Sequence, residues 1–139
     1  MNIVLDTNVL VAGLLSPFGT CGEIVRMVSS GELTLSFDAR ILVEYSEVLL
    51  RPKFRLKEDK IAALMDQIQH RGQTVAPSPL LHSLPDPDDA PFLEAAIAGN
   101  AVCVVTGNQI HFPSDLCQGV KVLSPAEFIV LFKSAELRG

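Results

Sequence analysis

Short apolar runs alternate along the chain with longer segments whose apolar residues recur every three or four positions. Runs bounded by turn-forming residues are typical of strands. The predicted strands are residues 2–5, 33–37, 74–76, 101–105 and 120–123. Because the central runs are apolar throughout and alternate with helical segments, we expect a parallel sheet that is covered by helices on both faces.

Helices are predicted where apolar residues recur with the period of an α-helix, most clearly in residues 58–69. Asp38 and Ser124 each precede such a segment, and both are residue types that commonly cap a helix start. The predicted helices are residues 9–15, 20–29, 39–49, 58–69, 88–98 and 125–132. The fold class expected from this order is α/β, a three-layer α/β/α sandwich with a central parallel sheet of four to five strands, in an order that the pattern leaves open.

The composition fits one globular domain that comprises residues 1–139. Hydrophobic residues make up 48% of the chain and charged residues 19%, which allows a buried core and argues against disorder. No apolar stretch approaches the length of a membrane span. The first residues lack the basic flank and cleavage site of a signal peptide, so we expect a cytoplasmic protein that does not enter a membrane.

Charge and cysteine usage narrow the functional classes. A net charge of −5 argues against a protein that coats nucleic acid non-specifically, although the acids of a metal site would contribute to that charge. Cys21, Cys103 and Cys117 form no C-x-x-C pair, and the three histidines are widely spaced. A zinc site is therefore not expected, and the cysteines are predicted to be small buried hydrophobes.

The basic residues gather in residues 51–57, with Lys60 close behind. One interpretation is an ordinary solvated loop followed by the start of a helix. The other is an edge of the molecule that contacts phosphates.

Polar clusters follow two predicted strands at the points where the strands end. Residues 6–8 (Asp-Thr-Asn) follow the first strand, and residues 106–108 (Thr-Gly-Asn) follow the fourth. Ligands of an open α/β sheet bind at the carboxyl ends of strands, near the switch in strand order. If these two strands are neighbours, both clusters face one crevice.

Two further acids lie on the apolar faces of predicted helices. Glu44 comes three residues after Ile41 and four before Val48, and Asp89 comes four residues before Leu93. A buried carboxylate is costly unless it is compensated, and no lysine or arginine is placed to pair with all of these acids. A divalent cation such as Mg²⁺ would compensate them, polarise a phosphodiester and lower the pKa of a water molecule.

Each of these polar residues also has an ordinary structural interpretation. Asp6 could cap the helix after the first strand, and Glu44 could form a buried ion pair with an arginine. Asp86 and Asp88 lie in a proline-rich turn, where caps and turn hydrogen bonds are common. Glu94 could face solvent, and the two threonines of the strand-end clusters could be turn residues. For all of these ordinary interpretations to hold at once, several unrelated coincidences would have to place acids at strand ends and on the apolar faces of helices.

Four blocks of the sequence resemble those of the PIN-domain family and occur in the same order. Residues 6–10 resemble its opening motif, and Glu44 resembles the second acidic position. Residues 86–96 resemble the third block, in which Asp89 is the best match to the metal-binding acid. Residues 104–108, followed by residues 111–113 (His-Phe-Pro), resemble the fourth block, so the resemblance covers nearly the whole chain.

The resemblance implies an endoribonuclease that depends on Mg²⁺ or Mn²⁺, most similar to the VapC-like toxins of bacterial toxin–antitoxin pairs. Such proteins are commonly homodimers and are inhibited by a small antitoxin protein. The resemblance makes Asp6, Glu44 and Asp89 metal ligands, directly or through water. Asn8 and Thr106 would orient ligands or water. The candidate catalytic residues are Asp6, Asn8, Glu44, Asp89, Thr106 and Asn108.

Asn108 departs from the family pattern, which often has Asp at this position. Because an amide oxygen is a weaker, neutral ligand, a second metal ion should bind less tightly unless Glu94 or Asp115 compensates. A non-catalytic PIN-like module that binds RNA or a protein is therefore the second hypothesis. A phosphotransfer domain is the third, but it requires either an acid where Asn8 stands or a lysine that ends a late strand, and Lys121 opens one. The helices between residues 41 and 68 are candidates for a dimer surface.

Overall fold

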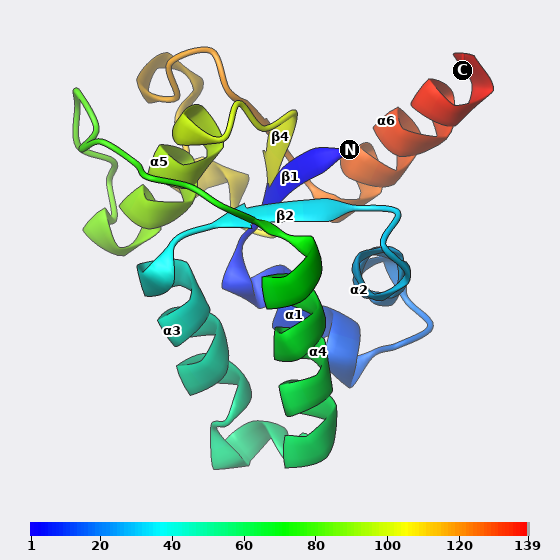
Figure 1. Cartoon of the computed structure of the whole chain (residues 1–139). Coiled ribbons are helices and arrows are strands. Elements are labelled where there is room, and N and C mark those ends of the chain that lie inside the picture. Colours follow the sequence, from blue (N-terminus) through cyan, green and yellow to red (C-terminus); the bar gives the residue numbers. More distant parts are fainter. Residues whose placement is uncertain (139) are drawn as a thin grey trace.

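The computed structural model describes residues 1–138 and contains a five-stranded parallel sheet with six α-helices around it (Figure 1). The strands are β1 (Asn2–Leu5), β2 (Thr34–Phe37), β3 (Gln73–Thr74), β4 (Cys103–Val105) and β5 (Lys121–Leu123). The helices are α1 (Thr7–Leu15), α2 (Thr20–Ser30), α3 (Ala39–Leu49), α4 (Glu58–Arg71), α5 (Ala90–Ala98) and α6 (Pro125–Arg138). Four short 3-10 helices lie in the connections: η1 (Pro52–Phe54), η2 (Pro87–Asp89), η3 (Gln109–His111) and η4 (Ser114–Leu116).

The strand order is β3-β2-β1-β4-β5, and every neighbouring pair is parallel. Figure 1 shows α5 above the sheet and α1, α2 and α4 below it. The predicted α/β/α sandwich is thus confirmed. The order also reverses between β1 and β4, because the chain first builds outward through β2 and β3 and then returns to the other side of β1. A reversal of this kind opens a crevice at the carboxyl ends of the two strands.

Several elements begin or end a few residues from their predicted bounds. Helix α1 begins at Thr7 because Asp6 occupies the N-cap position, so the polar residues after β1 belong to the first helical turn. Strand β4 begins at Cys103, later than predicted, because Asn100 has a left-handed backbone (φ 48°) and Ala101 donates its N–H to the carbonyl of Ala96. The backbone of residues 100–101 therefore still closes the end of α5.

The helix caps predicted at Asp38 and Ser124 are confirmed. The Asp38 side chain accepts a hydrogen bond from the N–H of Ile41 at the start of α3. At the start of α6, the Ser124 hydroxyl accepts from the N–H of Glu127, and the Glu127 carboxylate accepts from the N–H of Ser124. These reciprocal bonds satisfy backbone donors that a helix start otherwise leaves free.

The core lies between the sheet and its helices and includes the apolar residues of β1, β2 and β4, which are almost fully buried. Cys103 and Cys117 are buried and Cys21 is half-buried, and all three are free thiols, as expected of small hydrophobes. At Gly22, a Cβ atom would come within 2.1 Å of the carbonyl oxygen of Pro17, so only glycine lets α2 pack this closely against the preceding turn. Within residues 1–138 no single helix is long and apolar enough to span a membrane; α1 and α2 together pass on length and composition, although the chain bends by 103° between them.

Candidate metal centre

The pairing of β1 with β4 brings the two predicted polar clusters together. Leu5 is in register with Val105, so Asp6 and Thr106 follow side by side at the carboxyl ends of the two strands. The Thr106 hydroxyl is 2.8 Å from Asp6 Oδ2, and it also lies 3.0 Å from the N–H of Asn108. Because the backbone N–H of Asn108 donates to this hydroxyl, the hydroxyl proton is directed towards the Asp6 carboxylate.

Asn8 connects the same two clusters through its side-chain amide. Its Oδ1 accepts a hydrogen bond from the N–H of Gly107 at 3.2 Å, and its Nδ2 lies 3.4 Å from Asp6 Oδ2. With Oδ1 engaged as an acceptor, Nδ2 can only donate, and its donation faces the carboxylate. Asn8 and Thr106 therefore hold the Asp6 side chain from two sides.

Asp6 is 8% exposed, and its burial raises its pKa above the usual value. The hydrogen bond from Thr106 and the nearby N–H groups of Thr7 and Asn8 oppose that rise. Although Asp6 occupies the N-cap position of α1, its side chain makes no cap hydrogen bond that meets the usual geometry. The interpretation of Asp6 as only a helix cap is therefore not supported.

Glu44 lies beside Asp6 because α3 is attached to the end of β1. The hydroxyl of Tyr45 donates a 2.6 Å hydrogen bond to the carbonyl of Leu5, and the neighbouring Glu44 accepts a hydrogen bond from the Thr7 hydroxyl. Asp6 and Glu44 line one open cavity of about 430 Å³. The proposed ion pair between Glu44 and an arginine does not form: within residues 1–138, Glu44 has no lysine or arginine at salt-bridge distance.

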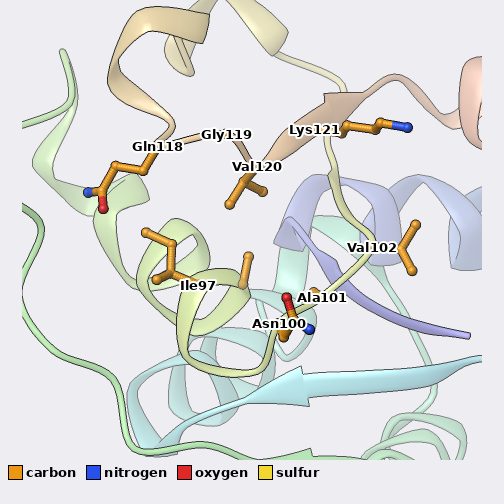
Figure 2. Close-up of a pocket in the computed structure, with 9 residues that line it drawn as sticks. Ile97, Asn100, Ala101, Val102, Gln118, Gly119, Val120 and Lys121 are labelled. Carbon is orange, nitrogen blue, oxygen red and sulfur yellow. The ribbon is translucent and has the colours of Figure 1, made fainter.

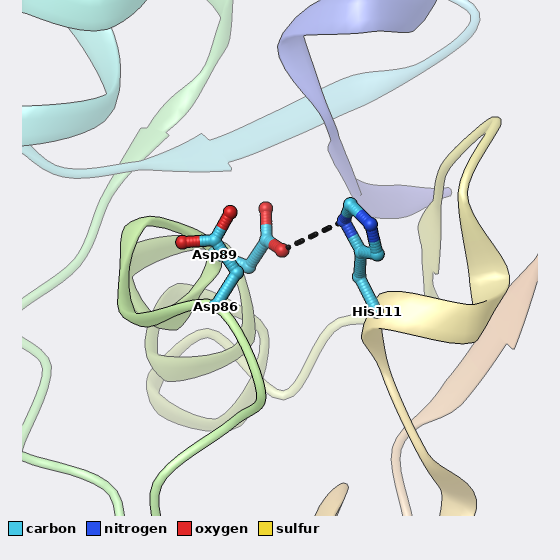
Figure 3. Close-up of side chains that lie close together, drawn as sticks. All are labelled: Asp86, Asp89 and His111. Atoms are coloured by element: carbon cyan, nitrogen blue, oxygen red, sulfur yellow. Dashed lines mark ion pairs between the residues drawn. The ribbon is translucent and has the colours of Figure 1, made fainter.

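Asp89 approaches the site from the start of α5 and lies between Asp86 and His111 (Figure 3). Its Oδ2 is 3.2 Å from Nδ1 of His111, which comes from η3 after β4. One potential ligand atom from each of these three side chains falls within 4.8 Å of the others. Asp86 also accepts a hydrogen bond from the N–H of Asp88, so Asp86 is a turn cap as expected, whereas Asp88 is exposed.

The Asp89 carboxyl is the most strongly perturbed acid of the site, with a pKa raised to about 6. Burial is the largest cause, followed by the negative charges of Asp6 and Asp86, while His111 acts in the opposite direction. Asp89 Oδ2 is buried and has no hydrogen-bond donor, because the short contact with His111 lacks hydrogen-bond geometry. The site thus contains a buried carboxylate oxygen that accepts no hydrogen bond and has the His111 ring as its close neighbour.

Asp6 is the shared neighbour of the predicted acidic residues. On one side it shares a cavity with Glu44, and on the other its charge raises the pKa of Asp89. Neither Asp6 nor Glu44 belongs to the group of potential ligand atoms within 4.8 Å, which instead consists of Asp86, Asp89 and His111. The assignment of Asp6, Glu44 and Asp89 as the ligand set therefore stays a prediction. Asn108 is exposed, and it contributes its backbone N–H to the site.

Three contributors to the site do not stand out in the sequence. His111 lies far from the other histidines in the sequence, and only its position after the fourth block points to the site. Asp86 lies in a proline-rich turn, which predicts a cap but not a neighbour of the metal centre. Tyr45 fits the apolar face of α3, and the spacing does not show that its hydroxyl positions the helix that carries Glu44.

Glu94 does not face solvent, so that prediction was wrong. It is buried, and its carboxylate lies 2.8 Å from Nη2 of Arg40 and accepts a hydrogen bond from the N–H of Leu80. The Arg40 guanidinium also contacts Asp38 at 2.7 Å. Glu94 is therefore neutralised by α3 and is not free to compensate for Asn108. Asp115 lies exposed on η4 and is not part of the acidic group either.

The donor set fits a divalent cation. Within residues 1–138, no lysine or arginine lies at salt-bridge distance from Asp6, Glu44 or Asp89. Arg40 pairs instead with Asp38 and Glu94. Carboxylate oxygens are the ligands that Mg²⁺ and Mn²⁺ prefer. A cation would offset the burial of the Asp89 carboxylate and its repulsion by Asp6 and Asp86, the two causes that raise its pKa.

A second hollow, of about 300 Å³, lies at the amino ends of β4 and β5, opposite to Asp6. Figure 2 shows Asn100, Gln118 and Lys121 around it. None of its lining residues is acidic. The hollow therefore lacks the ligands of a metal centre, and the crevice at the carboxyl ends of β1 and β4 remains the candidate site.

Comparison with known proteins agrees with this geometry. A family model described as "PIN domain" matches residues 2–110, a segment that contains all six candidate catalytic residues. An uncharacterized protein of Methanocaldococcus jannaschii, MJ1680, is 25% identical over 152 aligned residues, which cover 96% of this chain and 92% of that protein. PIN domains are generally metal-dependent nucleases. Because the family match extends over well more than half of its length, the chain belongs to the PIN-domain family.

Proposed function

We propose that this PIN domain is an endoribonuclease that depends on Mg²⁺ or Mn²⁺, and that it is the toxin of a VapC-like toxin–antitoxin pair. The observation that carries the nuclease proposal is the buried Oδ2 of Asp89, which accepts no hydrogen bond, has only the His111 ring beside it and lies within the electrostatic reach of Asp6. A cluster of carboxylates without a neighbouring lysine or arginine suits a site that binds a cation together with a phosphate.

Each residue of the cluster then has a role. Asp6, Glu44 and Asp89 hold the cation, directly or through water. The bound cation supplies the Lewis acidity that polarises the phosphodiester and acidifies water. Thr106 and Asn8 fix the Asp6 carboxylate by donating hydrogen bonds to it, and their hydrogen bonds leave its other oxygen, Oδ1, available.

Asp86 and His111 act around Asp89 in this proposal. Asp86 adds negative charge to the site, and the His111 ring lies close enough to Asp89 to restrict its position. Asn108 carries no charge, so the site has fewer carboxylates than a PIN domain with an acid at this position. We therefore propose that one cation binds tightly and that any second cation binds weakly.

A specific feature favours a second candidate function. Asn108 is exposed and neutral, which is also expected of a PIN-like module that binds RNA or a protein without cleaving it. The two functions differ in metal binding: a calorimetric titration that shows no Mn²⁺ binding at millimolar concentration supports the non-catalytic module.

The partners proposed for the toxin are RNA as substrate, a small antitoxin protein as inhibitor and a second copy of the chain. The support is the resemblance of the four sequence blocks to VapC-like proteins. Co-expression with the protein encoded by the adjacent gene tests the antitoxin, because growth arrest by this chain alone should be relieved by its partner. Light scattering of the purified chain tests the homodimer.

The nuclease proposal is tested by incubating a labelled single-stranded RNA with the protein and Mn²⁺. We expect cleavage that EDTA abolishes and that Asp6→Asn reduces by at least about 100-fold, since this side chain is the centre of the cluster. Asp115→Asn is the matched control, because it removes one exposed acid outside the cluster. An Asp6→Asn protein as active as the parent would contradict the proposal.

A further inference from the structure

Five of the 11 lysine and arginine residues of this acidic chain lie within residues 51–60, between α3 and the first turn of α4. These five side chains are exposed. Within residues 1–138, none of them lies at salt-bridge distance from an acid. They are Arg51, Lys53, Arg55, Lys57 and Lys60. We refer to residues 51–60 as the basic segment.

The basic segment lies at the far end of the helix that carries Glu44. Helix α3 continues from Glu44 to Leu49, which at 1.5 Å per residue is about 8 Å. Figure 1 shows α3 and α4 side by side, with η1 joining the ends that are remote from the sheet. A polyanion that places one phosphate at the acidic cluster can therefore bring its adjacent phosphates within reach of the basic segment.

An aromatic residue of the basic segment lines the cavity of the acidic cluster. Phe54 is half-buried and borders the same cavity of about 430 Å³ as Asp6 and Glu44. Between these acids and Phe54, the cavity wall is apolar and includes Val11 and Val48. The cavity thus offers an apolar and aromatic surface directly beside a candidate phosphodiesterase site.

Basic side chains flank this aromatic surface. Nζ of Lys53 lies 5.1 Å from the centroid of the Phe54 ring. Arg55, Lys57 and Lys60 border a smaller hollow of about 190 Å³. The chain links the two hollows, because Phe54 lines the first and the next residue, Arg55, lines the second. Phe54 thus shares a cavity with the acids and is in contact with one of the cations.

We propose that the basic segment binds the single-stranded part of the RNA substrate: an unpaired base stacks on Phe54, and the adjoining phosphates contact Lys53, Arg55 and Lys57. This inference rests on the proposed ribonuclease function and locates the surface of this chain that holds the substrate beside the acidic cluster. An aromatic face accepts a base only when that base is unpaired, and exposed cations favour the backbone beside it. A duplex cannot present a base face in this way, so paired RNA should bind more weakly.

The absence of tryptophan from the chain allows a direct test of stacking. In Phe54→Trp, the single indole should be quenched when a short labelled oligouridylate binds, because a stacked base quenches indole emission. Phe132→Trp, on α6, is the matched control and should stay unquenched. EDTA keeps the RNA intact during these titrations, and fluorescence anisotropy of the RNA reports binding independently.

Two further variants test the interactions with the base and the phosphates. Phe54→Leu keeps an apolar side chain without an aromatic face, and we expect it to weaken binding by roughly 10-fold. Arg55→Gln combined with Lys57→Gln should reduce the slope of log affinity against log salt by about 0.7 for each phosphate that is no longer neutralised. Lys121→Gln, at the hollow of Figure 2, should change neither quantity.

The inference is overturned if the RNA binds to Phe54→Trp without quenching its indole, or if Phe54→Leu and the double glutamine variant bind as tightly as the parent. The basic segment would then serve a different partner, such as a protein. Failure of the proposed ribonuclease function gives a different result. The protein would then show no RNA cleavage with Mn²⁺ but could still show indole quenching in Phe54→Trp and the reduced salt dependence of RNA binding in the double glutamine variant. Cleavage that is unaffected by all three variants leaves the ribonuclease proposal standing and overturns only the assignment of the basic segment.

Discussion

Replacing Asp89 by asparagine should stabilise the metal-free protein, although the substitution removes a candidate metal ligand. Burial and the charges of Asp6 and Asp86 raise the pKa of Asp89 from 3.8 to about 6, and its side chain is only 14% exposed. One pKa unit corresponds to about 1.4 kcal/mol, so an ionised Asp89 costs the folded state on the order of 3 kcal/mol. A neutral amide of similar shape avoids this cost, and we expect a gain of about 2–3 kcal/mol in the free energy of unfolding above neutral pH.

The pH dependence of this gain follows from the direction of the shift. The pKa of Asp89 is raised in the folded state, so the carboxylate lowers stability as the pH rises from the unfolded value of 3.8 to about 6. Below that interval the group is protonated in both states and contributes nothing. The parent and Asp89→Asn should therefore be equally stable at the acid end and diverge across this interval.

Urea unfolding in EDTA, followed by circular dichroism at several pH values, measures the difference. Asp88→Asn is the matched control, since it removes the same formal charge from an exposed neighbouring side chain and should leave stability nearly unchanged. Added Mn²⁺ should reverse the order, because ligand binding stabilises only the protein that binds it. The reasoning is refuted if Asp89→Asn is less stable than the parent at alkaline pH without metal.

Three other substitutions test separate parts of the site. Thr106→Val should keep the fold but lower Mn²⁺ affinity by about 10–100-fold in a calorimetric titration, whereas Thr106→Ser should preserve that affinity. A Thr106→Val protein that binds Mn²⁺ as tightly as the parent would exclude a positioning role for Thr106. Arg40→Met should destabilise the protein by about 2 kcal/mol in urea because it leaves Glu94 buried without its cation, and adding Glu94→Gln should recover most of that loss; no recovery would mean that the packing of Arg40 matters more than its charge. Tyr45→Phe should cost about 1 kcal/mol in urea and lower RNA cleavage, because the bond from α3 to the end of β1 is removed; unchanged cleavage would show that Glu44 needs no such anchor.

The part of the site that lies at strand ends could be predicted from the sequence, but the strand order that joins it could not. Apolar runs identify β1 and β4, and parallel strands place their carboxyl ends at one edge, so Asp6 and Thr106 meet if the two strands are neighbours. Their contact follows from the register of Leu5 with Val105. Local hydrogen bonds were equally accessible, as the cap at Asp38 shows.

The part that depends on how helices pack could not be predicted. Glu94 pairs with Arg40 only because α3 and α5 lie against each other, and the spacing of either residue in its own helix does not reveal this. His111 reaches Asp89 because η3 turns back towards the start of α5 after β4. Irregular segments of this kind have no periodicity from which the direction of a side chain can be inferred.

The location of the bound cation tests the account most directly. Crystals soaked in Mn²⁺ and measured for anomalous scattering should show a peak between the carboxylates of Asp6 and Asp89, with Oδ2 of Asp89 among its ligands. That peak should disappear in Asp89→Asn. A Mn²⁺-soaked crystal without a peak at these carboxylates, or with its ordered ion held by other residues, would contradict the claim that these acids converge to bind a divalent metal.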